Sequence, residues 1–275
     1  MIFEGRPAIV GHRGFGAGQP DGYRENSVES FLAAARHGVP WVELDARRSS
    51  DGELVLWHDP VTPAEQLVVA STAAELAAAR IVRLADVLTA LPAGVGVNID
   101  VKTTIEDATD PHAQRTHALI AEALHWFQGT RRFLVSSFDP SVPTYLKDRQ
   151  ALIGDVALGL ITEEQYPAAQ AVSAAANLGL DAVCLHTGAL QARRAQPRPA
   201  CLSAEQILGI AHAAGLEVMT WSPDPAEALL LAQAGVDAVC VNDVPGAQAA
   251  LAQLRPVAVD GCRSGGAITP SDRQP

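Results

Sequence analysis

The sequence predicts an α/β fold, a (β/α)₈ or TIM barrel with a short insertion after strand two. Eight short apolar, β-branched runs alternate with eight longer segments of helical pattern that are rich in Ala and Leu. Eight such pairs within about 250 residues are typical of this barrel. Gly38, Gly179, Gly215 and Gly235 each follow a predicted helix and precede a predicted strand, where a left-handed C-cap is expected. An open doubly wound sheet is disfavoured, because no glycine-rich phosphate loop follows the first strand.

The individual elements follow from apolar periodicity along the chain. The predicted strands are Ala8–Gly11, Trp41–Asp45, Val95–Val101, Phe133–Ser136, Val156–Ile161, Ala182–Leu185, Glu217–Trp221 and Ala238–Val241. The predicted helices are Val28–Arg36, Leu84–Leu91, His112–Phe127, Pro140–Lys147, Glu163–Leu178, Ser203–Ala214, Pro225–Gln233 and Gly246–Leu254. A tight-turn signal at Ser49–Gly52 predicts a hairpin between strand two and an extended piece at Glu53–Trp57.

The chain is expected to form a barrel domain over residues 1–255 and a tail over residues 256–275. The insertion covers residues 60–83 and contains a short helical pattern at Ala73–Ala79. The tail is rich in Gly, Pro, Ser and Arg and has no apolar periodicity, so we expect it to be disordered.

Composition places the chain among soluble globular proteins, with 48% hydrophobic and 19% charged residues. The net charge of -11 argues against nucleic-acid binding, because Lys and Arg number only 20 and form no long run. No uncharged apolar run reaches about 18 residues, so no stable membrane insertion is expected. The start shows no signal-peptide pattern and the four cysteines lack CxxC spacing, so the expected location is cytoplasmic.

Polar residues gather where the predicted strands end, which is where a barrel places its functional groups. Glu43 and Asp45 lie two residues apart on strand two and therefore share one face. Two carboxylates in an apolar setting are costly unless a cation or hydrogen-bond donors compensate them. Asp100 and Lys102 end strand three with the same spacing. Trp221 ends strand seven, where an aromatic side chain is expected to form a wall of a substrate pocket.

These residue types predict a metal-assisted reaction at a phosphoryl group. Glu43, Asp45 and Asp100 offer hard oxygen ligands, which suit one Mg²⁺ or Ca²⁺ ion. Arg13 and Lys102 supply the fixed positive charge that phosphate binding requires. The alternative is structural: Lys102 neutralises Asp100, or the acids of strand two form buried salt bridges.

Two histidines are candidate proton carriers, because their ordinary pKa lies near neutrality. His12 and His58 would share the work, one removing a proton from the nucleophile and the other protonating the leaving alkoxide. Taken alone, His12 could be a capping residue and His58 a turn residue. The other charged residues predicted at the same strand ends are what favours catalysis. For Asn26 and Ser27 we expect helix capping rather than catalysis.

With these motifs the chain resembles the glycerophosphodiester phosphodiesterase family, part of the phosphatidylinositol phospholipase C-like phosphodiesterase superfamily. The matching motifs are His12-Arg13-Gly14, Glu25-Asn26-Ser27, Glu43-Leu44-Asp45, Asp51-Gly52, His58-Asp59 and, later, Asn242-Asp243-Val244-Pro245. The resemblance runs from about Ile9 to Pro245 and implies hydrolysis of glycerophosphodiesters, small-molecule substrates, to glycerol 3-phosphate and an alcohol. It implies His12 and His58 as the acid/base pair, Glu43, Asp45 and Asp100 as metal ligands, and Arg13 and Lys102 as phosphate ligands.

The chain departs from the family pattern at three places. Asp100 stands where the family commonly has Glu, and Asp at this place also occurs in the related sphingomyelinase D-like barrels. Trp221-Ser222-Pro223-Asp224 replaces the usual Trp-Thr-Val-Asn, and Asn242-Asp243 replaces Thr-Asp. The alternative activity is therefore that of a lysophospholipase D or sphingomyelinase D. A catalytically silent barrel acting as a binding protein is the non-enzymatic alternative.

Overall fold

A computed structural model of the protein describes residues 1–5, 7–190 and 202–254. Its strands are β1 Ala8–Gly11, β2 Trp41–Arg48, β3 Leu54–Leu56, β4 Gly96–Val101, β5 Phe133–Ser137, β6 Val156–Thr162, β7 Ala182–His186, β8 Glu217–Trp221 and β9 Ala238–Val241. Its α-helices are α1 Val28–Arg36, α2 Ala73–Ala78, α3 Leu84–Ala90, α4 Thr116–Trp126, α5 Ser141–Lys147, α6 Gln150–Ile153, α7 Ala168–Leu178, α8 Thr187–Leu190, α9 Ala204–Ala213, α10 Pro225–Ala234 and α11 Val244–Leu251. Short 3₁₀ helices are η1 Pro20–Gly22, η2 Val68–Ala70, η3 Ile105–Ala108 and η4 His112–Gln114.

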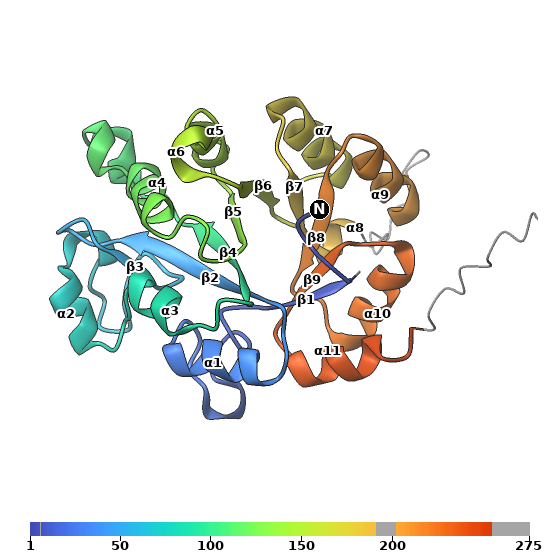
Figure 1. The fold of residues 1–275 in the computed structure, drawn as a ribbon, viewed down its shortest axis with the longest axis horizontal. Coiled ribbons are helices and arrows are strands. Elements are labelled where there is room, and N and C mark those ends of the chain that lie inside the picture. The colour runs from blue at the N-terminus through green and yellow to red at the C-terminus, as the bar shows by residue number, and fades with distance from the viewer. Residues whose placement is uncertain (6, 191–201, 255–275) are drawn as a thin grey trace, which may run out of the picture.

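The strands form the closed parallel barrel that the sequence predicts. Their order is β1-β9-β8-β7-β6-β5-β4-β2, and β2 pairs with β1 to close the ring. The larger helices surround the strands (Figure 1). β3 is the extra strand, and it lies antiparallel to the end of β2 as the far arm of the predicted hairpin. The insertion that follows β3 contains η2 and α2.

Several boundaries differ from the prediction for physical reasons. β2 runs on to Arg48 because β3 pairs with its last residues. α7 begins only at Ala168, since Pro167 is its N-cap and a residue before proline avoids helical backbone angles. The predicted helix over residues 112–127 is divided into η4 and α4 by an extended Arg115. The expected tail, residues 256–275, lies outside the described residues.

The inside of the barrel changes from apolar at its floor to acidic at its mouth. Trp41, at the start of β2, packs edge-on against Phe3 with the ring centroids 5.2 Å apart. Gly96 on β4 leaves room for this indole, because a Cβ there would lie 2.5 Å from the ring. Along the same face of β2 come Glu43 and then Asp45. The register sets Asp45 directly beside Asp100 of β4, which brings the predicted acids to one place.

The apolar layer between strands and helices carries the stability of the barrel. Leu44 points away from the acids into this layer and is fully buried. We expect Leu44→Ala to lower the free energy of unfolding by about 2–5 kcal/mol, because it removes buried methyl groups and leaves a cavity. Leu230→Ala, at a side chain that is 64% exposed, is the matched control and should change stability by no more than about 0.5 kcal/mol. Denaturant unfolding checks both, and equal effects would contradict this account of the layer.

Candidate active site at the barrel mouth

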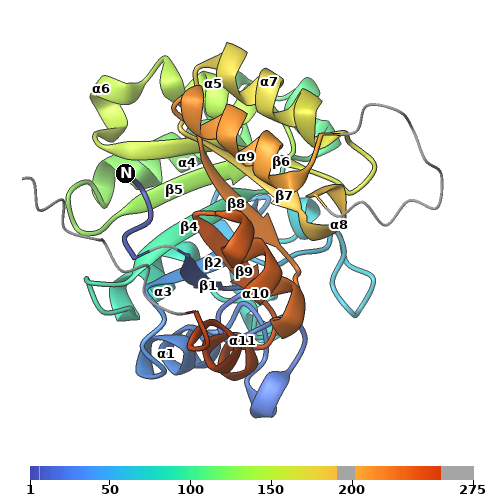
Figure 2. The same ribbon diagram turned by 90° about the vertical axis from the view of Figure 1, so that its right-hand side faces the viewer.

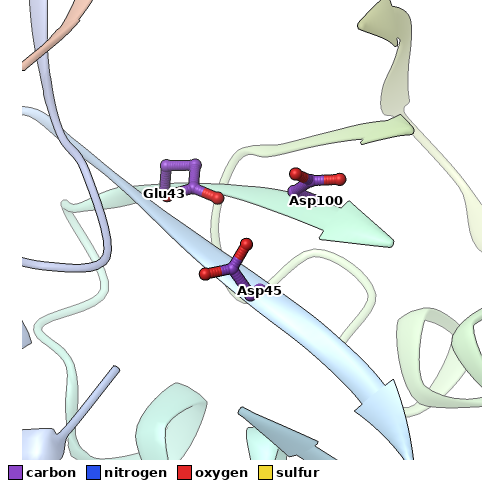
Figure 3. Close-up of side chains that lie close together, drawn as sticks. All are labelled: Glu43, Asp45 and Asp100. Carbon is purple, nitrogen blue, oxygen red and sulfur yellow. The ribbon is translucent and has the colours of Figure 1, made fainter. Parts of the chain in front are cut away.

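Three buried carboxylates meet at the carboxyl ends of β2 and β4. Glu43, Asp45 and Asp100 each offer one oxygen, and these three atoms lie within 4.8 Å of one another. Figure 3 shows Glu43 and Asp45 on one strand and Asp100 on its neighbour. All three side chains are at least nine-tenths buried. The structure thus brings together the three predicted metal ligands.

Two cations contact this group of acids. Lys102 Nζ lies 3.0 Å from Asp45 Oδ1 and contacts Asp100 Oδ2 as well. Arg13 Nε lies 3.1 Å from Asp45 Oδ2, and Arg13 Nη1 donates to Glu25 Oε1 at 2.8 Å. The backbone N–H of Arg13 donates to Glu43 Oε2 at 2.9 Å. Lys102 is therefore in ion pairs with two aspartates, the structural role that the sequence left as an alternative.

The charges at the mouth do not balance without a further cation. Four carboxylates, those of Glu25 and the three clustered acids, face the two fixed cations Arg13 and Lys102, while the charge of Arg47, which also acts on Asp45 and Asp100, is offset by Asp59. Full ionisation of these groups leaves two negative charges, which one divalent cation neutralises. This excess of negative charge affects the pKa values of the three acids.

The pKa of each acid follows from burial and from its neighbours. Burial and the nearby charges of Asp45 and Asp100 raise the pKa of Glu43 well above its usual value. Burial also raises the pKa of Asp100 to about 6, with Lys102 opposing the shift and Asp45 adding to it. For Asp45 burial is outweighed by Lys102 and Arg13, so its pKa is lowered. The raised pKa values of Glu43 and Asp100 reflect the same shortage of positive charge.

The donor set fits a divalent metal ion. Among the described residues, Asp100 Oδ1 is buried and has no hydrogen-bond partner, which leaves its lone pairs available. Carboxylate oxygens are the ligands that Mg²⁺ and Ca²⁺ prefer. An ion bound here would favour the ionised forms of Glu43 and Asp100 and satisfy the free oxygen.

His12 follows β1 and is held in one orientation by Asn242. His12 Nδ1 lies 2.6 Å from Asn242 Oδ1, which also accepts from the backbone N–H of Ala17 at 3.2 Å. An amide oxygen only accepts, so Nδ1 carries the proton and Nε2 keeps a lone pair. Nε2 lies 3.8 Å from Glu43 Oε2. Burial and the neighbouring Arg13 lower the pKa of His12, which favours the neutral ring.

His58 follows β3 and is fixed at both its ring and its backbone. Its Nδ1 donates to Asp59 Oδ1 at 2.7 Å, and its carbonyl oxygen accepts from Arg47 Nε at 2.9 Å and Nη2 at 2.6 Å. Arg47 therefore supports His58 and is not hydrogen-bonded to the acids of its own strand. The backbone N–H of Trp57, the residue before His58, donates to the Asp45 carbonyl at 3.1 Å, which brings this end of the hairpin to the acid cluster.

Aromatic rings form one wall of the mouth. Trp221 contacts Phe138 edge-on with centroids 6.0 Å apart, and His186 likewise at 4.5 Å. Lys102 Nζ lies 5.3 Å from the centroid of the Phe138 ring. Trp221 Nε1 is buried without a hydrogen-bond partner in the described part of the chain, so it is free to donate to a bound molecule.

Asn26 does more than the helix capping expected from the sequence. Its Nδ2 donates to Asp45 Oδ2 at 2.8 Å, and its Oδ1 accepts from the backbone N–H of Asp45 at 3.2 Å. Ser27 is the actual N-cap of α1. Both Asn26 and Arg13 have positive φ, 52° in each case. Such backbone angles cluster at functional sites, but no periodicity in the sequence predicts them.

Within residues 1–5, 7–190 and 202–254, every helix is too short or too polar to cross a membrane.

Solved structures share this fold at low sequence identity. The phosphodiesterase from Oleispira antarctica, solved in complex with the product sn-glycerol-3-phosphate, is 23% identical, with a TM-score of 0.70 over 90% of this chain and 97% of that one. The glycerophosphodiester phosphodiesterase from Thermotoga maritima is 20% identical, with a TM-score of 0.65 over 87% and 96% of the two chains.

Sequence comparison gives the family. A glycerophosphocholine phosphodiesterase from Schizosaccharomyces pombe is 43% identical over 56 residues, which are 19% of this chain and 5% of that protein. The chain thus spans only a small part of this curated relative. The Glycerophosphoryl diester phosphodiesterase family matches residues 12–245. This match spans most of the chain and includes every predicted site residue, so the chain belongs to the glycerophosphoryl diester phosphodiesterase family.

Proposed function

We propose that the protein hydrolyses glycerophosphodiesters to glycerol 3-phosphate and an alcohol. The observation that carries the proposal is the convergence of three carboxylates, two fixed cations and two histidines at the mouth of a barrel of this family. The related Oleispira antarctica phosphodiesterase binds sn-glycerol-3-phosphate as its product, which supports the same product here.

Glu43, Asp45 and Asp100 would hold one divalent cation, Mg²⁺ or Ca²⁺. When bound, this ion supplies positive charge for the phosphoryl oxygens. Arg13 and Lys102 would bind the phosphate from the same side, and Trp221 would contact the alcohol or the glycerol with its ring and its free N–H. The proposed substrate is a small-molecule phosphodiester.

His12 would act as the general base. Its Nδ1–H is committed to Asn242, so the lone pair on Nε2 faces the acid cluster and accepts the proton of the nucleophile. The lowered pKa of His12 keeps this lone pair available at neutral pH. The Asn242 contact supports this role by selecting one tautomer of the ring.

His58 would act as the general acid. The Asp59 carboxylate accepts a hydrogen bond from His58 Nδ1–H and stabilises the imidazolium, so that Nε2 can give its proton to the leaving alkoxide. Arg47 supports this role by holding the His58 carbonyl and with it the position of the ring.

We also propose that the protein is located in the cytoplasm. The free thiols of Cys184 and Cys240, which are buried in the barrel, agree with this location.

The direct test is release of glycerol 3-phosphate from glycerophosphocholine and glycerophosphoethanolamine, with Mg²⁺, Ca²⁺ or EDTA. We expect turnover that depends on the metal ion and falls by about 10²–10⁴-fold in His12→Ala, because proton removal from the nucleophile is lost. Asp155→Asn is the control and should keep full activity, because Asp155 is exposed and lies just before the start of β6, at the opposite end of the strand from the mouth. Absence of glycerol 3-phosphate with every ion tested would contradict the proposed function.

The roles of the two histidines can be separated by changing the leaving group. A p-nitrophenolate leaves without protonation, so His58→Ala should lose about 10²–10⁴-fold in kcat with glycerophosphocholine but far less with glycerophospho-p-nitrophenol. His12→Ala should lose activity with both compounds. Steady-state kinetics on the two substrates makes the comparison. Equal losses of His58→Ala on the two substrates would show that His58 is not the acid.

Metal affinity should rise with pH because the ion displaces protons from raised-pKa acids. With the pKa of Asp100 at about 6, the proton must leave at pH 5 but is already absent at pH 7.5. Binding of Mg²⁺ or Ca²⁺ should therefore be about tenfold tighter or more at pH 7.5 than at pH 5, where each bound ion displaces the proton of Asp100. Titration calorimetry measures this, and an affinity that stays constant over this range would refute the assigned ligands.

A further inference from the structure

An apolar cleft of about 640 Å³ adjoins the candidate active site. Its walls come from the β5–α5 loop, strand β6 and helix α7, and its central residues are Phe138, Leu160, Tyr166, Ala174 and Leu178. Seven of the ten residues that line it are apolar or aromatic, and Glu163 is the single charged one. The volume lies within the range of about 300–1,000 Å³ that small-molecule sites occupy.

The cleft exists because α5 and α7 leave a gap beside β6 and meet at their C-terminal ends, where Lys147 Nζ donates to the Leu178 carbonyl at 2.7 Å. α4 packs against α5 and α7 packs against α9, but α5 and α7, both fully described, are not among the closely packed pairs. α5 has only 7 residues, and α7 presents the small side chain of Ala174 toward the gap. Figure 1 shows α5 and α7 on either side of β6. The outward-facing Leu160 of β6 lines the bottom of the gap and is only 6% exposed.

Phe138 belongs to both the cleft and the active site. Its ring lines the cleft, contacts Trp221 edge-on and lies 5.3 Å from Lys102 Nζ. A group attached to a phosphate that is bound at Lys102 can therefore enter the cleft by passing this one ring. The lining residues include no Lys, Arg or His, so the occupant is not an anion.

Large hydrophobic side chains are exposed around the same mouth. Six of them lie on connections that follow β3 to β7, and they are Val61, Leu67, Ile105, Phe138, Tyr166 and Leu202. Figure 2 shows the loops after β1 and β3 on the same side of the barrel as α8, the side of the active site. A concentration of exposed apolar side chains indicates contact with an apolar partner. A substrate with a hydrocarbon chain matches both this rim and the cleft.

The geometry points to a hydrocarbon subsite: the cleft binds the single alkyl or acyl chain of a phosphodiester whose phosphate is held at the acid cluster. This inference rests on the proposed function and extends it from fully polar glycerophosphodiesters to single-chain amphiphiles. The same chemistry is offered by a chain on the leaving alcohol and by a chain on a glycerol hydroxyl.

A homologous series of substrates tests the subsite. Glycerophosphoethanol is the reference, glycerophosphodecanol carries the chain on the leaving alcohol, and 1-decylglycerophosphoethanol carries it on the glycerol, all below their aggregation concentrations. We expect kcat/KM to rise at least about tenfold for one of the decyl compounds, since burial of about two methylene groups already corresponds to a tenfold change. A gain in either arm supports the subsite and identifies the position of the chain. Equal or lower kcat/KM for both decyl compounds would overturn it.

Substitutions on α7 locate the effect. Ala174→Trp fills the cleft and should abolish the gain for the decyl compound, while kcat/KM for glycerophosphoethanol stays unchanged. Ala169→Trp, on an exposed position of the same helix outside the lining, is the matched control and should keep the gain. Tyr166→Ser removes an exposed ring from the wall of the cleft without filling the cleft. It should reduce the gain in kcat/KM for the decyl compound several-fold. A gain that survives both Ala174→Trp and Tyr166→Ser would place the chain elsewhere and contradict the proposal.

A binding measurement separates failure of the subsite from failure of the proposed function. Decyl phosphate should bind with an affinity that weakens about tenfold or more in Ala174→Trp and is unchanged in Ala169→Trp, as measured by calorimetry. This result without turnover of any diester would sustain the subsite and contradict the phosphodiesterase. Turnover of glycerophosphoethanol together with equal decyl phosphate binding in all three proteins would sustain the phosphodiesterase and contradict the subsite.

Discussion

The burial of like charges at the barrel mouth is the constraint on which the rest of the site depends. Glu43, Asp45 and Asp100 are held together by the register of β2 and β4, and solvent does not screen them. Each surrounding contact compensates part of this cost. Lys102 and Arg13 supply charge, and the amides of Arg13 and Asn26 donate to the acids. The remaining deficit of positive charge is what one divalent cation, held by the three acids, would supply.

The proposed catalytic groups are positioned by residues outside the strands. The backbone turns sharply at Arg13 and Asn26, and these turns direct one guanidinium and one amide at the same carboxylate, that of Asp45. Gly14 allows the first turn to lie against α1, because a Cβ there would meet Ser30 Oγ at 2.5 Å. Asn242 and Asp59 hold the two histidines in complementary ways, one ring with a lone pair toward the acids and the other with a carboxylate behind it. The barrel provides the frame, and these loops set the orientation of the two imidazole rings.

The sequence was sufficient to predict the barrel and the acid cluster because both depend on simple periodicities. Alternation of strands and helices predicted the fold, and a spacing of two predicted that Glu43 and Asp45 share a face. Helix starts were less predictable, as at α7, where a single proline moves the boundary. The supporting roles of Asn26, Arg47 and Asn242 could not be predicted, since each depends on a contact between segments that are distant in sequence or on a positive φ. The apolar cleft could not be predicted either, because it is a gap between α5 and α7 and corresponds to no sequence motif.

The central claim is that one divalent cation completes the charge balance of Glu43, Asp45 and Asp100. The most direct measurement is anomalous diffraction from crystals of the protein grown with Mn²⁺, which prefers the same oxygen ligands. The account predicts one strong anomalous peak bonded to oxygens of all three acids. Binding of the ion should also break the contact of Lys102 with at least one of its two aspartates, Asp45 and Asp100. No anomalous peak at the three acids, with both Lys102 ion pairs intact, would contradict the account.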